Sequence, residues 1–133
     1  MTTTEQKRFL IIDDDAQNNL LSKMSLKKTL GDVIVQDFTM PEAGFEYIQS
    51  DFFRNPDNDK TVLLLDINMP GMNGWEFLEK FEDLDYTIKN NFDIYILSSS
   101  VDPRDIERAH TNPHVIDFIE KPLNKEILMQ LFG

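Results

Sequence analysis

Acidic, hydroxyl and basic residues stand directly after short apolar runs in this sequence. They are Asp13, Asp14, Asp15, Asp66, Ser98 and Lys121. Two carboxylates about 4 Å apart repel by roughly 4 kcal/mol at an effective dielectric near 20, so clustered aspartates raise a pKa unless cations neutralise them. Hard oxygen ligands of this kind suit Mg²⁺. Carboxylate, metal, lysine and hydroxyl together form a phosphoryl-binding set in which one carboxylate can be the nucleophile.

The apolar runs that precede these residues predict the strands of a parallel sheet. The five runs are Phe9–Ile12, Val33–Val35, Val62–Leu65, Ile94–Leu97 and Val115–Ile119. Three of them are apolar without alternation, as is typical of strands covered on both faces, and the segments between the runs have helical spacing. The pattern predicts a doubly wound α/β fold, in which the ligand crevice lies at the carboxyl ends of the strands.

The helical segments carry start and stop signals. The first helical segment is predicted to end at Gly31. Its apolar side is predicted to consist of Leu20, Leu21, Met24 and Leu30. Asp15 is predicted to cap that helix. Thr39 with Glu42 predicts a capping box, and Asp102 before Pro103 predicts another helix start. After Gly74, a further helix is predicted to bury its apolar residues, Trp75, Leu78 and Phe81.

Three remaining segments are predicted from their length and polarity. Asp51–Lys60 is polar and contains a proline, so we predict a surface loop, and Asp83–Asp93 is predicted to be a similar connection. The last segment, Asn124–Leu131, predicts a helix of about two turns.

Length, charge and composition exclude several classes of protein. The chain has 133 residues, a formal net charge of −11 at pH 7 and no cysteine. The charge argues against nucleic acid or an anionic membrane as a direct partner, and the missing cysteine excludes thiol catalysis and disulfides. No apolar run approaches the roughly twenty residues of a spanning helix. We therefore expect one cytoplasmic domain over residues 1–133.

Four segments resemble, in order, the receiver domain of two-component response regulators: FLIIDDD, LLLDINMPGMNGWEFL, YILSSS and FIEKPL. The resemblance covers about Arg8 to Leu131 and implies a flavodoxin-like (βα)5 three-layer sandwich with a five-stranded parallel sheet. It implies a stand-alone, chemotaxis-regulator-like signalling domain without an output domain, which is not an enzyme beyond slow autodephosphorylation. The implied partners are a sensor histidine kinase or histidine phosphotransfer protein and a downstream protein target.

The resemblance also assigns roles to residues around the acidic pair. Asp66 matches the phosphoacceptor, and Asp13 and Asp14 match the acidic pair that binds Mg²⁺, with Asp14 as the direct ligand. The backbone carbonyl of Asn68 is expected to complete the metal site. Met69, Pro70 and Gly74 match the loop that follows the phosphoacceptor.

Three further matches concern phosphoryl binding and switching. Ser98 matches the hydroxyl residue that binds a phosphoryl oxygen, and Lys121 matches the lysine that pairs with the phosphoryl group, with a cis bond to Pro122. Phe118 matches the aromatic switch position. The sequence departs from the family pattern because Phe118 lacks a hydroxyl, Ser98 stands where threonine is commoner, and Ser99 stands where alanine or glycine is usual. The last two helices are also predicted to be short.

Two other functions stay open at the level of the sequence. A Mg²⁺-dependent phosphohydrolase that forms an aspartyl-phosphate commonly has a second aspartate two residues after the nucleophile; here that residue is Asn68, which cannot serve as a general acid. A degenerate receiver that acts only as a binding scaffold predicts the loss of Asp66, the acidic pair or Lys121, yet all are present.

Overall fold

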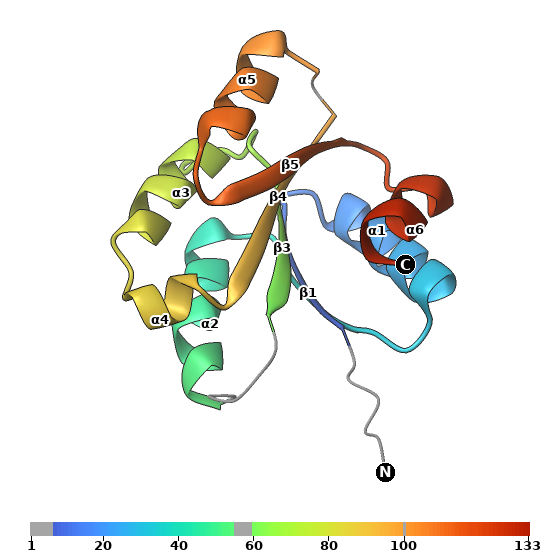
Figure 1. Cartoon of the computed structure of the whole chain (residues 1–133), viewed down its shortest axis with the longest axis horizontal. Helices are drawn as coiled ribbons and strands as arrows, with labels where there is room; N and C mark the ends of the chain where they lie inside the picture. Colours follow the sequence, from blue (N-terminus) through green and yellow to red (C-terminus); the bar gives the residue numbers. More distant parts are fainter. Residues whose placement is uncertain (1–6, 55–59, 100) are drawn as a thin grey trace.

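The computed structural model of the protein describes residues 7–54, 60–99 and 101–133. Five strands form one all-parallel sheet in the order β2-β1-β3-β4-β5 (Figure 1). Their bounds are β1 (Arg8–Ile12), β2 (Ile34–Phe38), β3 (Thr61–Leu65), β4 (Phe92–Ser98) and β5 (Val115–Glu120). The predicted five-stranded, doubly wound α/β fold is confirmed.

The helices cover both faces of the sheet and make the fold a three-layer sandwich (Figure 1). One face carries α1 (Ala16–Leu30) and α6 (Lys125–Phe132). The other carries α2 (Pro41–Arg54), α3 (Gly74–Glu82), α4 (Tyr86–Lys89) and α5 (Pro103–Thr111). Among the helices that the structure describes, none is long and apolar enough to cross a membrane.

Alternate residues of each central strand feed two separate hydrophobic cores. Leu10 and Ile12 of β1 pack toward α2 and α3, whereas Phe9 and Ile11 pack toward α1 and α6. All four side chains are at most 1% exposed. A strand covered on both faces has no need for polar alternation, which is why the apolar runs predicted the strands.

The edge strand β2 lies further along the chain than its predicted run, Val33–Val35. It spans Ile34–Phe38 because these residues pair in register with Arg8–Ile12 of β1. Its polar residues Gln36 and Asp37 end the apolar run. An edge strand tolerates polar residues because it pairs with only one neighbouring strand and is partly exposed to solvent.

The predicted helix caps are confirmed at two of three positions. Asp15 accepts hydrogen bonds from the backbone N–H groups of Gln17 and Asn18 at the start of α1. Asp102 accepts from the backbone N–H of Arg104, with proline at the first position of α5. The capping box predicted at Thr39 is wrong, because α2 begins at Pro41 and leaves Met40 at the cap position.

Two predicted loops contain helix. The segment Asp51–Lys60 begins inside α2, which runs to Arg54, and residues 55–59 lie outside the described part of the chain. The connection Asp83–Asp93 contains the short helix α4, and its last two residues belong to β4. α4 forms because Ile88, only 8% exposed, reaches the core and anchors one turn.

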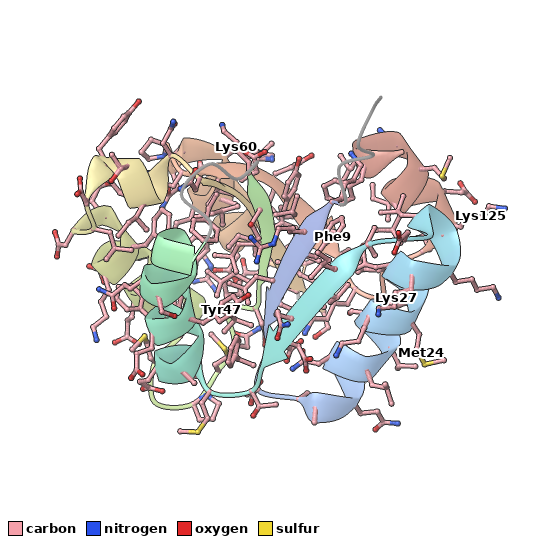
Figure 2. The ribbon with its side chains drawn as sticks, turned by 90° about the horizontal axis from the view of Figure 1, so that it is seen from below. Phe9, Met24, Lys27, Tyr47, Lys60 and Lys125 are labelled. Carbon is pink, nitrogen blue, oxygen red and sulfur yellow. The ribbon has the colours of Figure 1, made fainter. Side chains whose placement is uncertain are left out.

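The predicted apolar side of α1 is wrong for three of its four residues. Leu20, Leu21 and Met24 are more than half exposed, and Figure 2 shows Met24 pointing away from the sheet. The buried residues are Asn19, Ser22 and Leu26. The fourth predicted residue, Leu30, is half-buried against the core on this face of the sheet. Gly31 ends the helix with a φ of 85°, as predicted.

Candidate functional site

The predicted site residues lie together at the carboxyl edge of the sheet. β1, β3, β4 and β5 are consecutive in the sheet, so the residues that follow them share one edge. Asp13 and Asp66 are adjacent, because Ile12 pairs with Leu65 and the backbone N–H of Asp66 donates to Ile12 O at 2.9 Å. Ser98 is the last residue of β4 and Lys121 follows β5.

Three carboxylates form the acidic part of the site. Asp13, Asp14 and Asp66 each place one oxygen within 4.8 Å of the others. Asp13 and Asp66 are only 2% and 5% exposed, whereas Asp14 is exposed. This all-oxygen donor set, with one ligand at the rim that leaves room for water, fits the coordination that Mg²⁺ prefers.

Asn68 lies beside this cluster through its main chain. Its backbone N–H donates to Asp66 Oδ1 at 3.3 Å, which holds the chain of Asn68 against the carboxylate. The predicted role of its carbonyl in metal binding stays a prediction.

Lys121 closes the site from the β5 side. Its Nζ lies 2.6 Å from Asp13 Oδ2 and 3.6 Å from Asp66 Oδ1, so the direct partner of the lysine is Asp13. Its backbone N–H donates to Ser98 O at 2.9 Å, and the Lys121–Pro122 bond is cis as predicted. The pairing with Asp13 leaves the ammonium within reach of a group bound to Asp66.

Burial dominates the electrostatics of Asp66. Burial, the largest influence, raises the pKa of its carboxyl to about 6, while Lys121 opposes the rise and Asp13 adds to it. The sequence predicted a raised pKa from repulsion between carboxylates; repulsion contributes, but desolvation contributes more. Above pH 7 the carboxyl is mostly ionised, which is the form a nucleophile needs.

Gly74 allows α3 to begin against the main chain of Asp66. A Cβ at this position would lie 2.7 Å from the Asp66 carbonyl oxygen and 2.8 Å from Ile67 Cα. The backbone N–H of Gly74 donates to Ile67 O at 3.1 Å. Asn73 and Glu76 form a capping box at this helix start, which was not among the predicted helix caps.

Ser98 and Phe118 project toward the same face of the sheet. Ile96 pairs with Phe118, and Ser98 lies two residues beyond Ile96, so the serine and the aromatic ring are diagonal neighbours on adjacent strands. Ser98 is fully buried, and Phe118 is half-buried against the core that includes Ile96. The structure thus places Ser98 and Phe118 next to each other on one face of the sheet.

Two features near the site went unpredicted. Leu21, predicted to face the core, instead lines a groove with Lys121 and Pro122. Asn19 is fully buried and bonds to the main chain of Asp13. Apolar periodicity could not reveal either, since both depend on which face of α1 meets the sheet.

Comparison with known proteins gives consistent results. The sequence matches the family model described as "Response regulator receiver domain" over residues 9–132. A response regulator receiver protein from Dyadobacter fermentans DSM 18053 is 31% identical, with a TM-score of 0.81 over 96% of this chain and 98% of that chain. A two component response regulator from Cytophaga hutchinsonii is 30% identical, with a TM-score of 0.85 over 97% and 96%. A search of curated proteins found no match.

An all-parallel five-stranded sheet with an acidic cluster at its carboxyl edge defines the class of receiver domains. The chain belongs to the response regulator receiver family, the signalling domains of two-component systems.

Proposed function

We propose that this protein is a cytoplasmic receiver that accepts a phosphoryl group on Asp66. The donor is the phosphohistidine of a sensor histidine kinase or of a histidine phosphotransfer protein. The observation that carries the proposal is the meeting of a buried Asp66 with two further carboxylates and a lysine at one sheet edge. Phosphorylation then changes the contacts of the domain with a downstream protein.

The transfer needs a nucleophile and positive charge around the phosphoryl oxygens. A carboxylate oxygen of Asp66 forms the new P–O bond, the P–N bond of the phosphohistidine breaks, and the imidazole nitrogen keeps the electron pair. The Lys121 ammonium and the Ser98 hydroxyl then face the phosphoryl oxygens. Mg²⁺, held by Asp13, Asp14, Asp66 and the Asn68 carbonyl, would offset the negative charge that gathers there.

The apolar surface of α1 supports a protein as the phosphoryl donor. Leu21 lines the groove beside Lys121, and Leu20 and Met24 next to it are 56% and 58% exposed. Neighbouring exposed apolar side chains that form one patch at the rim of a site are typical of a protein interaction surface. L21E should therefore slow labelling by a phosphorylated histidine phosphotransfer protein and leave labelling by acetyl phosphate unchanged. Equal slowing with both donors would contradict this docking role.

Ser98 and Phe118 are proposed to carry the signal away from the site. Attraction of the Ser98 hydroxyl to the phosphoryl oxygens would vacate space that Phe118 can fill, and the ring has no hydroxyl to hold either position. NMR spectra with and without beryllofluoride, a mimic of the phosphoryl group, test this. We expect shifts around Ser98 and Phe118, and unchanged signals there would rule out this switch.

Incubation with acetyl phosphate and Mg²⁺, followed by intact mass measurement, tests the proposal as a whole. A single stable phosphoryl adduct that is lost in D66N supports the receiver. Turnover of many phosphate esters would favour the phosphohydrolase instead. No adduct and no turnover would favour a receiver that only binds partners.

A further inference from the structure

Asn19 is a buried polar residue on the face of α1 that covers the sheet. It lies on the side of α1 that faces the sheet and is fully buried. A buried side-chain amide in such a place costs stability unless it makes hydrogen bonds. The bonds that Asn19 makes therefore indicate why an amide stands there.

The amide of Asn19 joins two loops at the site. Its Nδ2 donates to Asp13 O at 3.0 Å and, at the longer distance of 3.4 Å, to Phe38 O. Asp13 ends β1 and begins the acidic pair, while Phe38 ends the neighbouring strand β2. The Asn19 side chain thus connects the turn at Asp13 and Asp14 to the end of the adjacent strand β2.

The orientation of the amide follows from its neighbours. Both contacts are carbonyl oxygens, so the NH₂ group must face them, and a flipped amide would place Oδ1 against two acceptors. Within the described residues, Oδ1 of Asn19 has no hydrogen-bond partner. An unmade bond to a buried acceptor is unfavourable, so this residue is not the choice that core stability alone would favour.

Other hydrogen bonds hold the same turn through its N–H groups, whereas Asn19 bonds to the carbonyl of Asp13. The backbone N–H of Asp13 donates to Phe38 O at 3.1 Å, and that of Asp15 donates to Asp13 Oδ1 at 2.9 Å. These bonds fix the N–H groups of the turn. The peptide plane between Asp13 and Asp14 is fixed through its oxygen, and its tilt sets where the Asp14 side chain points.

We propose that Asn19 is a positioning residue for the acidic pair. By holding the Asp13 carbonyl, it directs the carboxylates of Asp13 and Asp14 toward Asp66 and so presets the Mg²⁺ site. The proposal rests on the metal site of the proposed function and adds a residue that touches neither the metal nor the phosphoryl group. Loss of a group that orients metal ligands typically weakens metal binding 10- to 100-fold.

Calorimetric titration of the metal-free protein with Mg²⁺ tests this role. We expect N19L to raise the Kd about tenfold or more, while N18L, the same substitution one residue earlier, stays within twofold of wild type. A third variant, L26A, removes a fully buried side chain of the same helix. It should lower the unfolding temperature in EDTA but leave the Kd within twofold, which separates positioning from stability.

A second substitution keeps the test valid if leucine does not fit. N19A adds no bulk and removes the same donor, so its Kd should also rise at least fivefold. Wild-type Kd values for both Asn19 variants, in a protein that binds Mg²⁺ and is phosphorylated on Asp66, would overturn the role of Asn19 alone. A wild-type protein that neither binds Mg²⁺ nor gains a phosphoryl group would overturn the proposed function together with it.

Discussion

Replacing Asp66 by asparagine should stabilise the metal-free protein at neutral pH, although it removes the proposed phosphoacceptor. Asp66 is 5% exposed and burial raises the pKa of its carboxyl to about 6, so its ionised form opposes folding. An asparagine has the same shape and can still accept the hydrogen bond that Asn68 donates. The substitution therefore removes the buried charge and keeps the contact.

The expected gain in the free energy of unfolding follows from the change in the pKa of Asp66. A rise of the pKa from its ordinary 3.8 to about 6 is worth at most about 3 kcal/mol, since each pKa unit corresponds to roughly 1.4 kcal/mol. Solvent at the rim, where Asp14 is exposed, reduces this, and we expect about 2 kcal/mol above pH 7. Below pH 3.8 the carboxyl is protonated whether the chain is folded or unfolded, so the advantage of D66N vanishes.

Urea unfolding of both proteins in EDTA, from pH 4 to pH 8, measures this difference. The wild type should lose stability relative to D66N as the pH rises from about 4 to 6, and the gap should then stay constant. D85N is the matched control, because Asp85 is exposed and its side chain makes no cap hydrogen bond. A D66N protein no more stable than wild type at pH 7.5 would refute the reasoning.

Three other perturbations give distinct expected outcomes. K121M should raise the pKa of Asp66 further, because Lys121 lowers the pKa of this carboxyl. Labelling by acetyl phosphate should then fall most steeply below pH 7, and an unchanged pH profile would contradict this. G74A should cost at least about 2 kcal/mol in urea unfolding, since its Cβ would collide with main-chain atoms; a loss below 0.5 kcal/mol, on the order of surface substitutions, would contradict the close approach. R108A should shift Trp75 fluorescence to longer wavelength and cost about 0.5–1 kcal/mol, because the guanidinium lies 4.7 Å from the ring centroid; an unmoved emission maximum would contradict that contact.

The strands and the site edge were predictable because both depend on patterns that neighbouring residues carry. Four of the five predicted runs lie within the strands that form, because apolar runs of this length are typical of strands in a parallel sheet covered by helices. Asp13, Asp66 and Lys121 were predicted to meet because a parallel sheet brings all its carboxyl ends to one edge. Neither inference needs knowledge of side-chain packing.

The face of α1 was not predictable in the same way. Its apolar residues have helical spacing, but the buried side carries Asn19, Ser22 and Leu26, and Asn19 bonds to the main chain of Asp13 at the end of β1. The ion-pair partner of Lys121 could not be predicted from the sequence either. Its Nζ lies 1.0 Å closer to the Asp13 carboxylate than to that of Asp66, and this difference depends on side-chain packing. Such choices arise from tertiary packing, which overrides local pattern.

The contact between Asp13 and Lys121 joins residues 108 positions apart, and this separation has a consequence during protein synthesis. Chains are made from the amino end, so Asp66 leaves the ribosome before Ser98 and well before Lys121. A growing chain therefore carries the Asp66 carboxylate before the Ser98 hydroxyl and the Lys121 ammonium that complete the site have been made. If Asp66 is the acceptor as proposed, nascent chains should not take up a phosphoryl group, and each molecule becomes competent only after β5 and Lys121 have been translated.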